Sequence, residues 1–336
     1  MHKVDLKELA EKLNLSISTV SRALRDRYDI STRTKQRVMA LAAELNYQPN
    51  PYASSLRQRK SKTIGVVIPE IANNFFTLAI NGIESVAQEN GYHVLIYITH
   101  EDPEKEANII RHIRNGRVDG LLMSVSGNMD PVRDLKENGL PLVLFDRVSE
   151  DPQIPSVTTD DYQGGFDATS HLIENGCRNI AYLAVSKNLS INHKRMKGYQ
   201  DALKKNNIPY KDQLVINCGN DDAENLRKIE TLLQSRRRPD GVFASVEKLA
   251  VSTYEAARNC GLEIPRDLKL VGFSNMAVAS ILNPSLTTIT QPAYEIGKEA
   301  ASVLFHILEQ QEKKKNEPAS ASKVFRSELI KRDSSR

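Results

Sequence analysis

Apolar residues near the start of the chain recur at the spacing of a helix. The positions i, i+3, i+4 and i+7 are Leu6, Leu9, Ala10 and Leu13. Asp5 and Glu8 stand at the beginning of this stretch as a capping box, and Asn14 after it can adopt the left-handed conformation that ends a helix. A first helix with one inward face is therefore expected.

Two further short helices are predicted directly after the first. Ser16 can cap the second and Ser31 the third. The inward positions are Val20, Ala23 and Leu24, then Val38, Leu41, Ala42 and Leu45. The outward positions of the second helix are polar or cationic: Ser18, Ser21, Arg22 and Arg25. This arrangement is typical of an all-α helix-turn-helix module over residues 1–49, in which Ser18 and Arg22 could donate hydrogen bonds to DNA. A three-helix bundle without a DNA role is the alternative.

Beyond Thr63 the pattern changes to apolar runs separated by helical stretches. The runs are residues 64–68, 93–98, 120–123, 142–145, 180–183, 241–244 and 270–273. Such alternation predicts α/β architecture, with parallel sheets covered by helices on both faces. The repeats exceed one sheet, so residues 64–336 are expected to form two Rossmann-like lobes. A ligand would bind between them, beyond the carboxyl ends of the strands. A final strand is expected over Phe325–Ile330, and Gly164-Gly165 is expected to allow close helix packing.

Charge is distributed unevenly along the chain. Residues 1–63 hold 13 Lys/Arg against 6 Asp/Glu, whereas the remainder holds 33 against 36. A cationic first fifth is the electrostatic footprint of a nucleic-acid-binding domain. Charge alone would equally fit a solvated surface, but together with the outward Ser/Arg face it favours DNA.

Other classes of protein lack their usual sequence features. The chain opens without the apolar run of a secretory signal and has no stretch of about 18 apolar residues, so a cytoplasmic protein without a membrane segment is expected. The three cysteines and seven histidines are scattered, which favours neither a metal nor a redox site. No glycine-rich phosphate loop or catalytic constellation occurs, so we expect no cofactor and no enzyme. The other alternative is a solute-binding protein for transport. Such a protein would carry an export signal and would lack a basic head.

Two motifs in the head resemble those of the lactose-repressor/galactose-repressor family. Residues 47–56 read Tyr-Gln-Pro-Asn-Pro-Tyr-Ala-Ser-Ser-Leu, similar to the family pattern Tyr-x-Pro-Asn-x-x-Ala-x-x-Leu, and residues 18–24 resemble its recognition helix. The resemblance implies that residues 50–63 form a hinge helix and linker, and that Leu56 wedges open a base step in the minor groove. The residues expected to contact DNA are Ser16, Ile17, Ser18, Thr19, Ser21, Arg22, Asn50, Ala53 and Leu56. The alternative for Leu56 is an ordinary core position.

The resemblance extends over the body, which is similar to periplasmic sugar-binding proteins. It implies that residues after successive strands line an effector site: Asn73, Phe75, Phe76, Asp146, Arg195, Glu247, Ser274, Asn275 and Gln291. One of the two phenylalanines is expected to be helix core, and a salt bridge between the lobes is the alternative for each charged residue. Val246-Glu247 stands where the family has Asn-Asp, and Ser274-Asn275 where it has Asp-Asp, so the resemblance implies a sugar-like ligand without fixing its identity.

The family implied by these motifs consists of ligand-responsive transcription regulators. We therefore expect a homodimer that binds a palindromic DNA operator, with a sugar-like small molecule in the cleft controlling affinity. Repressor and activator both remain open, as do release and promotion of DNA binding by the ligand.

Overall fold

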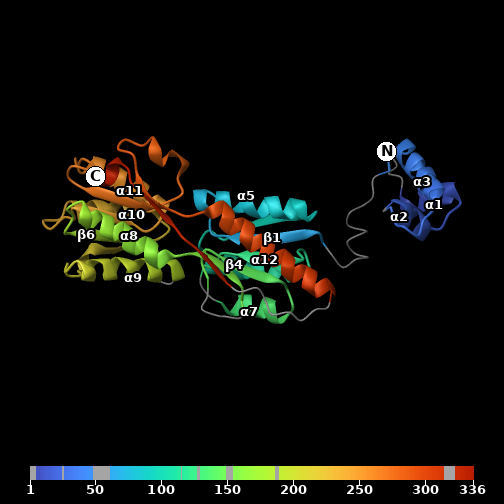
Figure 1. Cartoon of the computed structure of the whole chain (residues 1–336), viewed down its shortest axis with the longest axis horizontal. Coiled ribbons are helices and arrows are strands. Elements are labelled where there is room, and N and C mark those ends of the chain that lie inside the picture. The colour runs from blue at the N-terminus through green and yellow to red at the C-terminus, as the bar shows by residue number, and fades with distance from the viewer. Residues whose placement is uncertain are drawn as a thin grey trace. The chain divides into compact units, whose positions relative to one another are not determined.

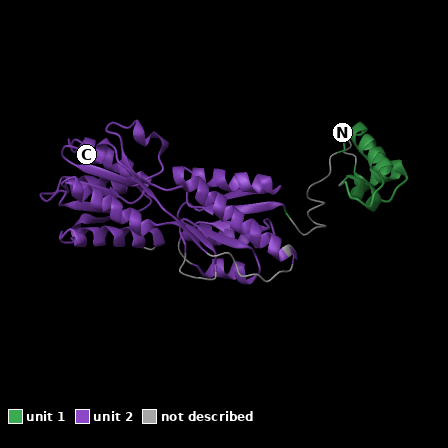
Figure 2. Cartoon of the chain, viewed as in Figure 1, with its two compact units in different colours: residues 1–61 green, residues 62–336 purple. Residues whose placement is uncertain are grey.

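The computed structural model describes residues 5–24, 26–47, 61–114, 116–126, 129–148, 154–185, 189–313 and 322–336. The chain divides into two compact units, residues 1–61 and 62–336, each built around its own hydrophobic core (Figure 2). Among the described helices, none combines the length and apolar character needed to cross a membrane. The predicted hinge residues Asn50, Ala53 and Leu56 lie outside the described residues.

The described residues of the first unit form three helices. They are α1 (Leu6–Leu13), α2 (Ile17–Leu24) and α3 (Thr32–Glu44). Leu9, Val20 and Val38 are fully buried between them. The predicted caps are confirmed, because Asp5 accepts the Glu8 N–H at 2.8 Å and Asn14 is left-handed with φ of 57°.

The second unit contains two sheets of six strands, each the centre of one lobe. The first lobe has the strand order β11-β5-β4-β3-β1-β2, and the second has β12-β10-β9-β8-β6-β7. Strands of the first lobe are β1 (Thr63–Ile68), β2 (His93–Ile98), β3 (Gly120–Met123), β4 (Leu142–Phe145), β5 (Ser156–Thr159) and β11 (Lys323–Phe325). Strands of the second lobe are β6 (Ile180–Ala184), β7 (Val215–Asn217), β8 (Gly241–Ala244), β9 (Lys269–Phe273), β10 (Thr287–Thr290) and β12 (Glu328–Ile330). All pairings are parallel except β10 with β12, so the predicted parallel α/β lobes are confirmed.

Helices cover both faces of each sheet, giving three layers per lobe (Figure 1). In the first lobe they are α5 (Asn74–Glu89), α12 (Ala293–Lys313), α6 (Pro103–Ile113) and α7 (Asp130–Glu137). In the second lobe they are α8 (Asp161–Glu174), α9 (Ser190–Lys205), α10 (Asp222–Leu233) and α11 (Glu247–Asn259). Three short 3₁₀ helices also lie in the second lobe: η1 (Asp212–Leu214), η2 (Ala277–Ser280) and η3 (Asp333–Ser335).

The glycines in α8 allow the closest helix contact in the second lobe. A Cβ on Gly165 would collide with the backbone of Arg195, and one on Gly198 would collide with the carbonyl oxygen of Tyr162. Because α8 and α9 touch through these positions, the start of α8 lies directly beside Arg195. The prediction that Gly164-Gly165 serves close packing is confirmed.

The chain crosses between the lobes after β5, after β10 and between β11 and β12. The prediction of one strand over Phe325–Ile330 is therefore wrong: β11 pairs with β5 in the first lobe, and β12 pairs with β10 in the second. The physical reason is that Arg326 and Ser327 lie between the two lobes, where no neighbouring strand can pair with them. The strands β5 and β7 were not predicted, because three of the four residues of β5 are polar and β7 has only three residues.

Candidate functional site

The exposed side of α2 carries the polar residues predicted to read DNA. Ser16 caps this helix by accepting the Thr19 N–H at 3.1 Å. Ser18 and Arg22 are exposed, Thr19 and Ser21 are half-buried, and Ile17 protrudes with 40% of its surface exposed. Val20 and Ala23 are buried on the opposite side. The solvent-exposed side of helix α2 is therefore mostly polar, with one protruding apolar side chain, Ile17.

Arg22 is held in place by neighbours within the head. Its Nη1 lies 2.7 Å from the Asp29 carboxylate, and its Nε donates to the Ser18 carbonyl at 3.3 Å. Both charged side chains are more than a third exposed, so the ion pair is weak and can open when another acceptor arrives. Asp29 was not predicted from the sequence, since its position in the turn after α2 gives no periodic pattern.

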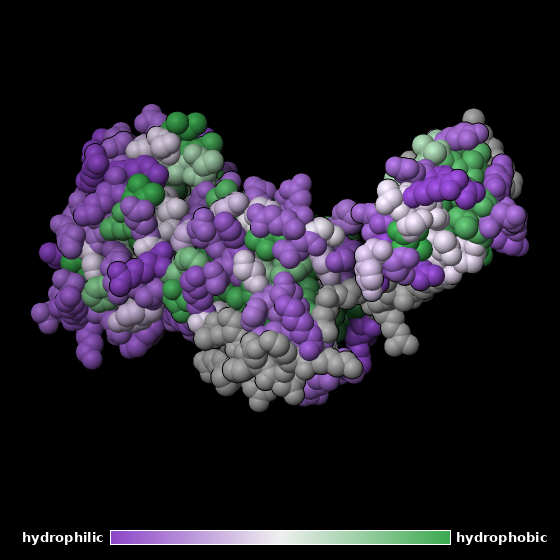
Figure 3. Space-filling model, turned by 45° about the vertical axis from the view of Figure 1, so that its right-hand side comes forward, coloured by the Kyte–Doolittle hydropathy of each residue, from purple (hydrophilic) through white to green (hydrophobic). Residues whose placement is uncertain are grey.

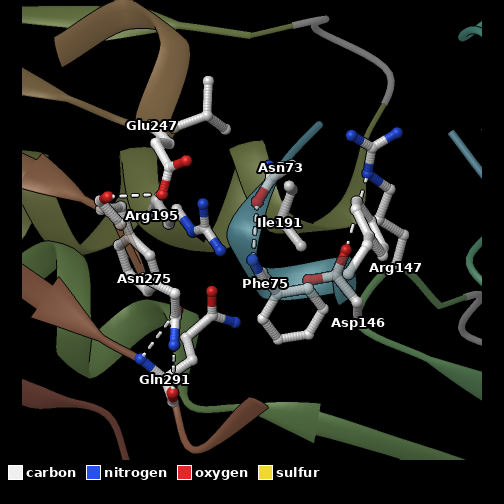
Figure 4. A pocket seen from close by; sticks show the side chains of 13 residues that line it. Asn73, Phe75, Asp146, Arg147, Ile191, Arg195, Glu247, Asn275 and Gln291 are labelled. Atoms are coloured by element: carbon white, nitrogen blue, oxygen red, sulfur yellow. Dashed lines mark hydrogen bonds and ion pairs between the residues drawn. The ribbon is translucent and has the colours of Figure 1, made fainter. Parts of the chain in front are cut away.

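All nine residues predicted to bind an effector line one pocket between the two lobes (Figure 4). Four more residues complete its lining: Arg147, Ile191, Val246 and Phe273. The empty space within this lining, part of it open to solvent, is about 340 Å³, and the pocket lies at the carboxyl ends of strands from both sheets, where ligands bind in such folds. Asp146 and Arg147 face it from one side, and Glu247, Asn275 and Gln291 from the other.

The first lobe contributes the start of α5 to the pocket. Asn73 caps this helix by accepting the Phe75 N–H at 3.0 Å. Phe75 and Phe76 are both buried and meet edge to face, with ring centroids 5.2 Å apart. Phe76 also packs against Phe145, which makes it the core member of the pair and leaves Phe75 as the better stacking surface.

Asp146 follows β4 in a strained, buried position. Its φ is 60°, in the left-handed region that non-glycine residues rarely adopt. Its carboxylate accepts a long hydrogen bond of 3.3 Å from the Ser124 hydroxyl and lies 3.8 Å from Nε of Arg147. Burial raises the pKa of Asp146 to about 6, despite the opposing influence of Arg147. This carboxylate is poorly compensated by the protein.

Arg147 uses its guanidinium elsewhere. It forms a bidentate pair with Glu101, with both N···O distances at 2.7 Å. Its Nε is buried and has no hydrogen-bond partner. Arg147 therefore lines the pocket as a cation whose charge is balanced by the Glu101 carboxylate.

Arg195 on α9 is fixed within the second lobe. Its Nε donates to Asp161 at 2.8 Å, its Nη1 donates to the Ser245 carbonyl at 2.5 Å, and the guanidinium lies 3.5 Å from the centroid of Phe273. Burial raises the pKa of Asp161, and Arg195 opposes that shift. Asp161 starts α8 in the same lobe, so the alternative of a salt bridge between lobes is wrong for Arg195.

Unlike Arg195, Glu247 of the second lobe contacts the first lobe, through a hydrogen bond with a neutral side chain. Its Oε1 accepts from the Asn74 amide of the first lobe at 2.7 Å, and its Oε2 accepts from the Ser274 hydroxyl at 2.7 Å. The side chain of Glu247 is 8% exposed. One carboxylate thus joins both lobes at the pocket.

Asn275 and Gln291 connect the pocket to a crossover. Asn275 donates to the Gln291 carbonyl at 2.6 Å and accepts the Gln291 N–H at 3.2 Å. The Gln291 side chain donates to Thr159 of the first lobe at 2.9 Å. These contacts connect the starts of two crossovers, the one after β5 and the one after β10. Among the described residues, no group of three or more His, Cys, Asp or Glu side chains could hold a metal ion.

Besides the apolar lining residues, three polar residues that shape the pocket were not predicted from the sequence: Asp161, Arg147 and Asn74. Asp161 was visible only as an acidic residue before Gly164-Gly165. Arg147 and Asn74 are immediate neighbours of predicted residues, so their sequence position gave a hint, but their partners lie 46 and 173 residues away along the chain.

Two family models cover nearly the whole chain. The model for periplasmic binding proteins and the sugar-binding domain of the LacI family matches residues 61–328, and the model for bacterial regulatory proteins of the lacI family matches residues 5–50. The two models match the two units, with the DNA-binding family model on the first unit and the sugar-binding family model on the second, as the motifs predicted.

Individual proteins give the same result. Catabolite control protein A of Priestia megaterium is 32% identical over 304 residues, which are 90% of this chain and 91% of that protein. The transcriptional repressor CytR of Escherichia coli is 32% identical over 332 residues, covering 98% and 96%. A lac repressor dimer bound to operator and the anti-inducer ONPF matches in fold, with a TM-score of 0.86 over 99% of both chains at 23% identity.

Head, sheets and pocket together define a DNA-binding transcription regulator with a periplasmic-binding-protein-like body. The chain belongs to the LacI family. The family resemblance seen in the motifs is confirmed, and so is the prediction of a regulator rather than an enzyme, because the relatives are regulators.

Proposed function

We propose that this protein is a ligand-responsive transcriptional repressor that works in the cytoplasm as a homodimer on a palindromic operator. Its effector is a small sugar or sugar derivative bound between the lobes. The observation that carries the proposal is the pocket itself. Charged and amide side chains from both lobes converge on it, and the same chain carries a cationic helix-turn-helix head.

We propose that α2 enters the major groove of the operator. The contacts would come from Ser16, Ile17, Ser18, Thr19, Ser21 and Arg22, which occupy its start and its outer side. Ile17 would meet a thymine methyl group and Arg22 a guanine edge or a phosphate. Residues 1–49 would thus read the major groove. The hinge, residues 50–63, would contact the minor groove through Asn50, Ala53 and Leu56.

Exposed apolar side chains on both lobes support a homodimer. Leu78 lies on α5, and Val251, Val278 and Ile281 lie on or beside α11 and η2, with exposed fractions between 37% and 78%. Figure 1 places α5 and α11 on the same, upper side of the body, and Figure 3 shows hydrophobic side chains on the surface of both lobes. A second copy of the chain is the partner we propose for this surface, and a standard interface would bury about 800 Å² of accessible surface on each subunit.

The proposed control mechanism uses the inter-lobe crossovers. A ligand that contacts Asp146 on one side and Glu247 on the other binds both lobes, so it favours one lobe-to-lobe angle over others. The dimer would convert that angle into the spacing of the two heads, and hence into DNA affinity.

The test begins with selection of DNA from random duplexes by the full chain. We expect inverted repeats. Fluorescence anisotropy on the best duplex, at fixed salt, should then show at least a tenfold change in Kd with one member of a panel of sugars, sugar phosphates and nucleobases. Selected sequences without inverted symmetry, or a Kd that no compound changes, contradict the proposal.

The dimer is tested by sedimentation of two matched variants. Ile281→Glu places a charge at a 78% exposed apolar position of the proposed interface, and should give monomers. Val324→Glu makes the same change at a 60% exposed position on β11, outside that surface, and should sediment as a dimer. The reverse pattern contradicts the proposed surface.

A further inference from the structure

The charges that line the pocket do not balance. Of the described lining residues, four are charged: Asp146, Arg147, Arg195 and Glu247. Each arginine already faces a carboxylate outside the lining, because Arg147 grips Glu101 and Arg195 grips Asp161. Four carboxylates thus surround two guanidinium groups. The surplus negative charge belongs to Asp146 and Glu247.

Neither surplus carboxylate has a cationic hydrogen-bond partner among the described residues. Asp146 receives one long hydrogen bond from Ser124, and the nearest Arg147 nitrogen is 3.8 Å away. Glu247 accepts from two neutral donors, Asn74 and Ser274. Both carboxylates are more than nine-tenths buried. A buried carboxylate is costly when its counter-charge is absent, as for Glu247, or distant, as for Asp146, so a ligand that supplies a positive group is stabilised at this place.

The hydrogen bond between Asn74 and Glu247, which joins the lobes, also favours a cationic ligand. The Asn74 amide holds Glu247 Oε1 with a neutral donor. A ligand group that replaces it must donate a hydrogen bond to an anion. An ammonium group does so with a charge-assisted bond, which is about twice as strong as a neutral one. A phosphate or carboxylate would instead face two like charges.

We propose that the cleft selects a cationic, hydroxyl-bearing ligand, an aminated sugar in chemical class, and that Asp146 and Glu247 together supply the negative charge it binds. This inference rests on the proposed ligand-controlled function and specifies its effector. Arg147 and Arg195 then act as positioning residues, because their own carboxylate partners leave no free positive charge for an anionic ligand.

A matched panel tests the inference on the full chain. The panel consists of D-glucose, D-galactose and D-mannose, each as the neutral sugar, the 2-amino sugar and the 6-phosphate. Thermal shift identifies binders, since a ligand that binds the folded state raises Tm. Isothermal titration then gives each Kd. We expect at least one amino sugar to bind at least tenfold more tightly than its neutral parent, and the phosphates not to bind.

Charge-removing variants separate a direct role from a structural one. Asp146→Asn and Glu247→Gln keep the shape of the side chains, and each should reduce the amino-to-neutral affinity ratio about tenfold. Asp222→Asn, an exposed carboxylate in the first turn of α10, is the matched control and should leave the ratio unchanged. A purely structural role would weaken all sugars alike and leave the ratio constant, which overturns the proposed role.

The other outcomes are equally decisive. If neutral or phosphorylated sugars bind at least as tightly as their amino counterparts, the inference is wrong while the ligand-controlled function stands. If no compound of any class changes Tm or DNA affinity, the proposed function itself is contradicted and the inference falls with it.

Discussion

The head and the cleft each present an arginine held by a carboxylate, in opposite surroundings. Arg22 and Asp29 on the head have side chains 44% and 37% exposed, whereas Arg195 and Asp161 in the cleft are 3% and 2% exposed. Water screens the first pair, so it is weak and can exchange partners. The second pair is desolvated, so removing either member strands the other. The arginine proposed to release its partner on DNA is exposed, and the arginine that lines the pocket is held in a buried pair.

The largest effect is expected from Arg195→Ala. It leaves the Asp161 carboxyl without its partner in a buried site and should destabilise the second lobe by about 3–5 kcal/mol, as well as abolish any effector response. Thermal unfolding followed by circular dichroism measures the loss. The double variant Arg195→Ala/Asp161→Asn should recover part of it, because the unpaired charge is gone. Additive losses in the double variant would show that the two residues do not act as a pair.

Asp146→Asn should act in the opposite direction and stabilise the body. Burial raises the pKa of Asp146 from 3.8 to about 6, so ionisation of Asp146 lowers the stability of the folded state as pH rises from about 4 to 6. Above that range the penalty is constant, at up to about 3 kcal/mol for a shift of this size. Asparagine also tolerates the left-handed backbone at this residue, where φ is 60°.

The pH dependence provides the control for Asp146→Asn. The gain in Tm should be clearly larger at pH 8 than at pH 5, where the wild-type carboxyl is mostly protonated. Asp222→Asn should change Tm little at either pH, because Asp222 is exposed. An equal gain at both pH values would mean that the charge of Asp146 is not the cause.

The sequence predicted which residues line the pocket better than it predicted which of them contact one another. Most of the nine predicted lining residues lie just beyond strand ends, which share one edge of a parallel sheet, whereas Arg195 lies within α9 and was implied by the family resemblance. The partners of Arg195 and Glu247 do not follow from this geometry. Asp161 lies beside Arg195 because two glycines let α8 and α9 touch, and Asn74 reaches Glu247 from the other lobe, 173 residues away along the chain.

The same distinction holds for the fold. Long buried strands such as β1 and β9 are predicted from their continuous apolar residues. The segment from Phe325 to Ile330 also has a strand-like pattern, but its halves belong to different sheets. The local sequence pattern predicts that this segment is extended. Which strand each half of the segment pairs with depends on where the two lobes lie.

Arg22→Ala should weaken binding to the selected operator by about 1–3 kcal/mol if Arg22 contacts a base with both guanidinium nitrogens. The unfolding temperature of the head should hardly change, because the lost ion pair is exposed. Anisotropy on the operator and on a random duplex separates the two possible roles. A loss on the operator alone indicates base reading, and an equal loss on both indicates a phosphate contact. Unchanged affinity for both duplexes would exclude Arg22 from the interface.

The smallest effect is expected from Asp29→Asn, which frees Arg22 without altering it. Since an exposed ion pair contributes at most about 1 kcal/mol, DNA affinity should rise by no more than about fivefold. The rise should vanish when Arg22→Ala is already present. Asp26→Asn is the matched control: Asp26 pairs with Lys35 at 2.7 Å, so its effect should be the same with or without Arg22. If Asp29→Asn increases affinity equally in both backgrounds, the change reflects only the net charge of the head, and Asp29 does not restrain the arginine.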